Sequence, residues 1–104
     1  MKPRSSKRAL ALAISVETKR RVYERDLGAC VWCGSPGLPE AHYIPRSKSG
    51  LGIEENILTL CRPCHDRYDN GSRAERECMR EEFRRYLASL YEDWDEENLI
   101  YRRH

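Results

Sequence analysis

The sequence predicts an α+β fold, in which a short pair of strands and a helix are held together by paired cysteines. Cys30-x-x-Cys33 and Cys61-x-x-Cys64 form two such pairs, which we call the first and second knuckle, and residues 34–60 lie between them. Short apolar segments suited to strands occupy this interval, and helical apolar patterns flank it on both sides. We therefore expect a small module that is preceded by one helix and followed by a longer helix.

Composition and spacing divide the chain of 104 residues into three parts. We expect a basic arm with a short apolar segment over residues 1–14, the cysteine-containing module over residues 15–71, and a helix with a tail over residues 72–104. The length suits one domain. Since 35% of the residues are charged and only 39% are hydrophobic, the core is small and a metal staple would compensate for missing apolar burial.

The amino-terminal part concentrates positive charge, although the formal net charge of the chain is only +2. Its first residues have nothing to bury and are expected to be unstructured; the cations are Lys2, Arg4, Lys7 and Arg8. Such an arm suits either a phosphate backbone or a solubilising tail. Ala9–Ile14 could be an extended segment or a helical turn, and periodicity does not decide between them.

From Ser15 the pattern becomes helical, with Ser15 as the amino-terminal cap and Gly28 as the stop. Val16, Arg20, Tyr23 and Leu27 recur at spacings of three and four, as residues on one face of a helix do, and an exposed basic face is expected at Lys19, Arg21 and Arg25. After the first knuckle, Glu40–Pro45 is expected to be a strand and Arg46–Gly52 a basic turn. A short strand or buried segment over 57–60 then leads into a helix that ends near Asn70.

A strong helical pattern covers Arg73–Tyr91. Its apolar stripe should pack on the cysteine module or form a dimer seam; the stripe is Met79, Phe83, Tyr86, Leu87, Leu90 and Trp94. Cys78 lies near this stripe and is expected to be an unligated core thiol. The tail Asp95–His104 has no clear pattern.

Two Cys-x-x-Cys pairs predict a structural zinc bound by four thiolates. The sequence contains five cysteines, which is an odd number. It shows no convincing signal peptide and no apolar stretch of transmembrane length. We therefore expect a reducing cytoplasm, where cysteines bind metal instead of forming disulfides, and no membrane association. A redox role is disfavoured because the pairs are duplicated and lack a thioredoxin-like context. Zinc with four thiolates has no open position, so catalysis would need a second centre.

His42, Asn56 and His65 are the candidates for that centre. The zinc staple should bring the end of the His42 strand near the start of the His65 helix, with Asn56 on the returning segment and Asp69 one helical turn beyond His65. This order of His, Asn and His, with the last His directly after the second knuckle, resembles the HNH endonucleases. The resemblance is to the branch with four zinc-binding cysteines that is often found in phages and prophages, and it covers about Val22 to Asn70.

The resemblance implies a ββα-metal fold and hydrolysis of DNA phosphodiester bonds. It implies that His42 is the general base, that His65 binds a catalytic divalent cation such as Mg²⁺ or Mn²⁺, and that Asn56 orders the loop and helps to orient the base. Many relatives place a second metal ligand directly before the base, where this chain has Ala41. Either Glu40 or Asp69 replaces that ligand, or the metal is bound weakly.

Charge and proximity suggest contacts to DNA phosphates from five cations, Arg46, Lys48, Arg67, Arg20 and Arg21. The favoured function is a metal-dependent DNA endonuclease or nickase. The alternative is a zinc-ribbon module that binds DNA or assists assembly without catalysis, and the absence of a ligand at Ala41 favours that alternative. Either protein could be a homodimer.

Overall fold

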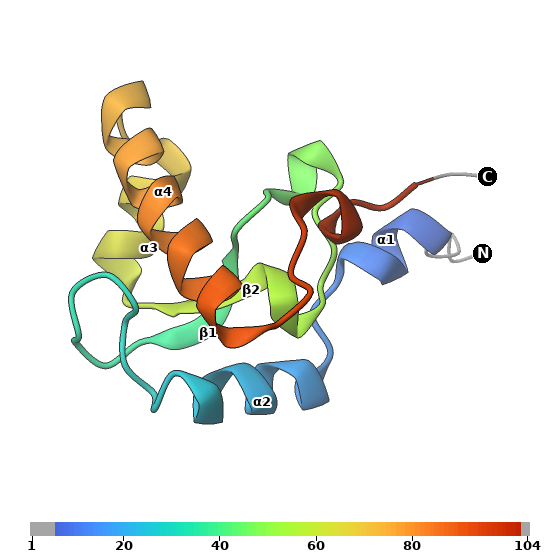
Figure 1. Cartoon of the computed structure of the whole chain (residues 1–104), viewed down its shortest axis with the longest axis horizontal. Helices are drawn as coiled ribbons and strands as arrows, with labels where there is room; N and C mark the ends of the chain where they lie inside the picture. Colours follow the sequence, from blue (N-terminus) through green and yellow to red (C-terminus); the bar gives the residue numbers. More distant parts are fainter. Residues whose placement is uncertain (1–5, 103–104) are drawn as a thin grey trace, which may run out of the picture.

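The computed structural model describes residues 6–102 and has an α+β architecture (Figure 1). Its regular elements are the helices α1 (Lys7–Leu12), α2 (Val16–Arg25), α3 (Arg62–Asn70) and α4 (Arg73–Leu90), and the strands β1 (Leu38–His42) and β2 (Ile57–Leu60). Three 3₁₀ turns complete it, namely η1 (Arg46–Lys48), η2 (Glu54–Asn56) and η3 (Glu96–Leu99). The predicted fold class is confirmed.

The two strands form an antiparallel hairpin that leads directly into α3. Ala41 pairs with Leu58 and His42 with Ile57, and all four residues of β2 are buried. In Figure 1, α2 runs along one side of this hairpin, while α3 and α4 stand on the other. This ββα arrangement places the carboxyl end of β1 and the start of α3 in the same region of the molecule.

The first strand ends at His42, earlier than the predicted Glu40–Pro45. The reason is that Ile44 bonds to a side chain instead of a neighbouring strand. Its N–H donates to Oδ1 of Asn56 at 2.8 Å, and Nδ2 of Asn56 donates to the Ile44 carbonyl at 3.2 Å and to the Leu51 carbonyl at 2.8 Å. Asn56 is fully buried and thereby closes the loop of residues 43–56, which we call the β1–β2 loop.

Helix α2 begins as predicted, since the Ser15 side chain accepts from the N–H of Thr18 at 3.1 Å. The helical face marked by Val16, Arg20, Tyr23 and Leu27 is not the buried face. Val16 is 84% exposed and Leu27 is 88% exposed, whereas the buried residue is Val22. Leu27 lies beyond the end of the helix in a left-handed conformation, with φ of 57°, so helical periodicity does not apply to it.

Arg25 was expected on the exposed face and is instead largely buried. It forms an ion pair with Asp26 at 2.8 Å and donates to the carbonyls of Glu54 at 2.8 Å and Ile57 at 2.7 Å. Asp26 in turn accepts from the N–H of Thr59 at 3.0 Å and from the Tyr86 hydroxyl at 2.5 Å. A buried ion pair is stable only when hydrogen bonds satisfy both charges, and here they join α2, β2 and α4.

The amino-terminal arm is ordered further than expected. Lys7 and Arg8 belong to α1, which Ser6 caps, so the helical alternative holds for Ala9–Leu12. Lys2 and Arg4, which were also expected to be unstructured, lie outside the described residues. Helix α1 docks on the β1–β2 loop, because Gly52 donates to the Ala11 carbonyl at 3.0 Å. A Cβ atom at Gly52 would lie 2.1 Å from the Ala13 carbonyl oxygen, so glycine is required for this close approach.

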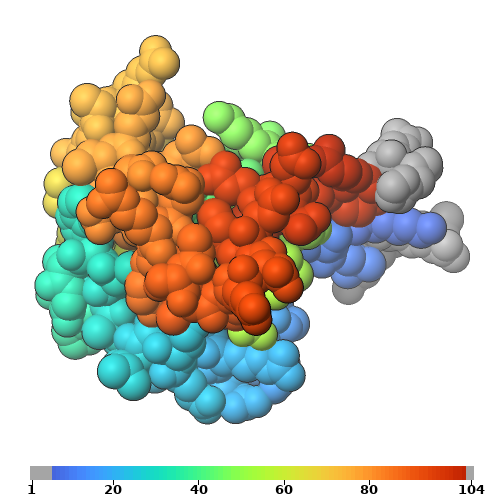
Figure 2. Space-filling model, viewed as in Figure 1, coloured from blue at the N-terminus to red at the C-terminus, as the bar shows by residue number. Residues whose placement is uncertain are grey.

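The carboxyl-terminal tail holds the same loop from another direction. The N–H of Leu51 donates to the Leu99 carbonyl and the N–H of Tyr101 to the Ser49 carbonyl, both at 2.8 Å. Leu99 itself is buried. In the space-filling view, α4 and the segment after it cover the face of the molecule above the hairpin (Figure 2). The β1–β2 loop is therefore fixed by both flanks of the chain.

Helix α4 begins at Arg73 as predicted and buries Met79, Phe83 and Leu87. The Phe83 ring meets the Tyr68 ring edge-on with centroids 4.9 Å apart, so the stripe packs against α3. The expectation of a core thiol at Cys78 is wrong, because this side chain falls beside the stripe and is exposed. Across residues 6–102 no helix is both long enough and apolar enough to cross a membrane.

Truncation of Phe83 should strongly destabilise the fold. Phe83→Ala removes a fully buried ring that contacts both Tyr68 and Trp32. Large-to-small changes of this kind cost about 3–5 kcal/mol, whereas Leu90→Ala on the same helix should cost less than about 1 kcal/mol because Leu90 is 42% exposed. Urea unfolding of the two variants gives the comparison, and equal losses would contradict this packing.

Candidate functional site

The four predicted metal-binding cysteines converge on one point. The sulfur atoms of Cys30, Cys33, Cys61 and Cys64 all lie within 4.8 Å of one another, and those of Cys33 and Cys61 are 3.5 Å apart. Zinc–sulfur bonds of about 2.3 Å in a tetrahedron place the sulfurs about 3.8 Å apart. The cluster therefore has the dimensions of a four-thiolate metal site.

The surroundings of these thiols also fit a bound cation. Burial raises the pKa of the Cys64 thiol, so this group would not ionise by itself at neutral pH. Hydrogen bonding from Ser35 lowers the pKa of Cys33 to about 6. A cation at the centre would stabilise all four thiolates. The donor set fits a structural metal such as zinc, and it leaves no open position for water or substrate.

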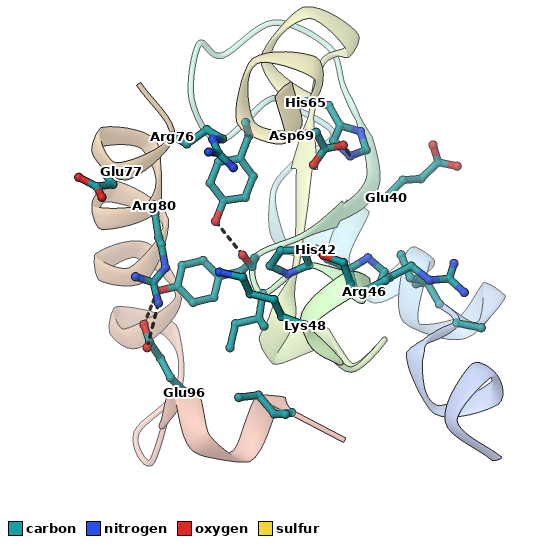
Figure 3. Close-up of a pocket in the computed structure, with 18 of the residues that line it drawn as sticks. Glu40, His42, Arg46, Lys48, His65, Asp69, Arg76, Glu77, Arg80 and Glu96 are labelled. Carbon is teal, nitrogen blue, oxygen red and sulfur yellow. Dashed lines mark hydrogen bonds and ion pairs between the residues drawn. The ribbon is translucent and has the colours of Figure 1, made fainter. Parts of the chain in front are cut away.

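A separate groove lies beside the hairpin, with a volume of about 1250 Å³. This is larger than a typical pocket for a small ligand, and polar and charged side chains from several elements line it. His42 and Glu40 come from β1, His65 and Asp69 from α3, and further cations come from η1 and α4 (Figure 3). The two histidines singled out in the sequence therefore share one groove.

His42 lies at the end of β1, and its Nε2 atom is 2.9 Å from the Leu12 carbonyl oxygen. A carbonyl can only accept, so Nε2 carries the hydrogen and the neutral ring keeps its lone pair on Nδ1. Burial lowers the pKa of His42 below its ordinary value, which favours the neutral ring. A histidine held in this state can accept a proton near neutral pH.

His65 and Asp69 lie one turn apart on α3, with Nε2 of His65 3.2 Å from Oδ2 of Asp69. Glu40 does not join them. Its carboxylate points away from this pair in Figure 3 and lies 3.6 Å from the ammonium group of Lys19. Within residues 6–102, the four cysteines are the only group of three or more metal-binding side chains with converging ligand atoms. Ala41 is fully buried and offers no ligand.

Asn56 lies outside the groove. Its side chain bonds only to the backbone of the β1–β2 loop, and its carbonyl accepts from the N–H of Tyr43, the residue that follows His42, at 2.7 Å. Asn56 therefore acts on the site by fixing the backbone beside His42. Contact with a reacting atom would require a side chain that reaches the groove, and this one is fully buried.

The five cations expected to contact phosphates are divided by the structure. Arg46 and Lys48 line the groove, whereas Arg67, Arg20 and Arg21 do not. Arg67 pairs with Glu75, and Arg20 and Arg21 both pair with Glu17. Sequence reasoning missed the cations of α4 that line the groove, Arg73, Arg76 and Arg80. Their spacing of three and four residues, which places them on one helical face, was the available signal.

A ββα unit with a four-cysteine metal site and two histidines in one groove defines a nuclease-type metal-binding module. The family model described as HNH endonuclease matches residues 30–71, the segment that contains the four clustered cysteines and both histidines of the groove. A search of curated proteins found no match. Helices α1, α2 and α4 lie outside the matched segment.

Loss of one clustered cysteine should remove the structural metal. In Cys64→Ser the buried hydroxyl cannot replace a thiolate ligand, so the purified variant should contain far less than one zinc ion per chain and should unfold more readily. Cys78→Ser is the matched control, because Cys78 is exposed and outside the cluster. Elemental analysis gives the metal content. Full zinc occupancy in Cys64→Ser would contradict the assignment.

The lowered pKa of His42 predicts a pH dependence of stability. The unfolded chain, with a histidine pKa near 6.5, binds the proton at a pH where the folded chain does not, so stability falls as the pH drops below about 6.5. His42→Gln lacks this contribution. The difference in unfolding free energy between wild type and His42→Gln should be constant at pH 7.5–8 and should shift against wild type toward pH 5.5.

Effects of acid on the metal site are common to both proteins and cancel in this difference. Urea unfolding in steps of half a pH unit gives the curve. A flat difference, or one that moves in favour of wild type, would show that His42 is not held in its neutral form by burial.

Proposed function

We propose that this chain is a metal-dependent endonuclease that hydrolyses phosphodiester bonds of DNA. The observation that carries the proposal is the geometry of His42. This residue lines the groove together with His65, and its Nε2–H donates a hydrogen bond to the Leu12 carbonyl. The match of residues 30–71 to the HNH endonuclease family supports the same reaction. Structural zinc at the four cysteines supports the hairpin and α3, and the thiolates suit a reducing compartment such as the cytoplasm.

In the proposed reaction Nδ1 of His42 is the general base. It takes a proton from a water molecule as the water oxygen attacks the phosphorus atom, and the bond from phosphorus to the 3′ oxygen breaks. The products are a 5′ phosphate and a 3′ hydroxyl, the 3′ oxygen receiving a proton from solvent. Because the Leu12 carbonyl fixes one ring nitrogen, the other keeps one orientation in the groove.

His65 and Asp69 are the proposed ligands of a catalytic Mg²⁺ or Mn²⁺ ion, because they already adjoin each other in the groove. When bound there, the ion would supply positive charge that stabilises the phosphate and the leaving oxygen. Glu40 could join only after leaving Lys19 and turning toward α3. With two protein ligands, the ion would bind weakly and depend on water and phosphate oxygens for the rest of its coordination.

A zinc module that binds DNA without cleaving it is the second candidate function, and the buried Ala41 favours it. Both candidates use the same groove and the same structural metal, so only a cleavage measurement separates them. A homodimer would have to use a surface other than the buried stripe of α4, since Met79, Phe83 and Leu87 are covered within the chain.

Replacement of the base should abolish cleavage while the fold is kept. We expect wild type to nick supercoiled plasmid when Mg²⁺ or Mn²⁺ is added, and His42→Ala to be slower by about 100-fold or more. Zinc content and thermal stability are measured on both proteins so that loss of fold is recognised. Arg85→Gln, a change on the outer surface of α4, should cleave as wild type does.

Two outcomes would reject the nuclease. Equal nicking by wild type and His42→Ala would remove His42 from the mechanism and point to a contaminating activity. No nicking by zinc-loaded wild type with any divalent cation, combined with retained binding of DNA, would establish the non-catalytic module.

A further inference from the structure

The groove has two walls that come from different parts of the chain. One wall is η1, which belongs to the HNH segment and carries Arg46 and Lys48, and the other is α4, which lies beyond that segment and carries Arg73, Arg76 and Arg80. Figure 3 shows His42 in the space between Arg46 on one side and Arg76 and Arg80 on the other. A chain of phosphates that reaches His42 would therefore pass between two sets of cations.

Half of the lysine and arginine side chains that line the groove are already paired with carboxylates within the chain. Arg73 pairs with Glu77 at 3.1 Å, and Arg80 pairs with Glu96 at 3.3 Å. Within residues 6–102, three cations of the groove form no ion pair, namely Arg46, Lys48 and Arg76. Such exposed cations are the groups able to bind phosphate without first breaking an internal pair.

Arg76 is presented by a rigid element. The side chain of Ser72 caps α4 by accepting from the N–H of Glu75 at 3.2 Å, and the buried Met79 and Phe83 fix the helix one and two turns further on. Arg80, by contrast, is engaged within the chain, because its guanidinium lies over the Tyr43 ring, 5.6 Å from the ring centroid, and pairs with Glu96. The backbone of Arg76 is therefore held in place by the helix, while its unpaired guanidinium lines the groove.

Acidic groups limit where the phosphates can lie. Glu96 and Glu97 of η3 line the part of the groove that adjoins Arg80, and Glu97 forms no ion pair within the described part of the chain. A phosphate there would meet negative charge. Asp69 also lies in the groove beside His65, but under the proposed function the catalytic cation would neutralise its carboxylate, so phosphates could approach the part of the groove near Arg76, His65 and His42.

We propose that α4 forms the second wall of a groove for double-stranded DNA, and that Arg76 contacts a backbone phosphate near the scissile bond. The identity of the ligand as DNA rests on the proposed function, but the surface itself rests on the geometry and pairing of the cations. The nucleic-acid contact of this chain then extends beyond the segment that matches the HNH family.

Binding of DNA tests this inference without reference to cleavage. The full-length chain carrying His42→Ala keeps the DNA intact, and its affinity for a fluorescein-labelled duplex of about 20 base pairs is measured by anisotropy at several salt concentrations. Adding Arg76→Gln should weaken binding about 3- to 10-fold at low salt and lower the slope of log K against log salt by about 0.9. Adding Arg76→Lys should restore most of that slope, because the charge is kept.

Arg85→Gln is the matched control, because it removes the same charge from the same helix at an exposed position outside the groove. Its salt slope should equal that of the parent protein. Equal effects of Arg76→Gln and Arg85→Gln, or no DNA binding by the zinc-loaded parent, would overturn the inference. A specific effect of Arg76→Gln in a protein that never cleaves would uphold the surface and reject the nuclease, whereas cleavage with no effect at Arg76 would do the reverse.

Discussion

Four sulfur atoms within 4.8 Å of one another join the turn after α2 to the start of α3, and the remaining geometry depends on this closure. The hairpin lies between the two knuckles, so joining them also brings its open end against α3. His42 is the last residue of β1 and His65 lies in the first turn of α3, and both line one groove. Since the apolar core of this chain is small, a metal cross-link at the cysteines would help to hold the polar side chains of the groove in fixed relative positions. A metal held by these cysteines would thus fix the distance between two histidines that it does not touch.

A second layer of support fixes the β1–β2 loop. Asn56 bonds to the loop backbone from inside, the Ala11 carbonyl accepts from Gly52, and the tail pairs with Ser49 and Leu51. The same amino-terminal segment supplies the carbonyl that orients His42. Buried polar groups such as these are stable only when each has a partner, so the loop has one low-energy conformation. The site is therefore built jointly by the family segment and by the two flanks.

The features predictable from sequence are those fixed by local spacing. The two knuckles, the helix after Cys61 and the helix from Arg73 follow from intervals of three and four residues and from caps. The expected exposed face of α2 is wrong at Arg25, because the carbonyls of Glu54 and Ile57, which are distant in sequence, accept hydrogen bonds from its guanidinium. The spacing of Arg73, Arg76 and Arg80 indicates one helical face, but the direction of that face depends on the packing of Phe83 against Tyr68, which spacing does not predict. Long-range polar contacts have no periodic signature.

The docking of both flanks onto one loop has a consequence for how such a module can be inherited. Residues 30–71 are the part that family comparison detects, yet the Leu12 carbonyl and the Leu99 carbonyl lie outside it. If only the detectable segment were recombined into another gene, it would carry the histidines without the backbone that orients them. The unit that must travel together is therefore longer than the unit that sequence comparison marks. Exchange at the edges of the motif would separate His42 from the Leu12 carbonyl and Leu51 from the Leu99 carbonyl, whereas exchange beyond the two flanks would keep both contacts.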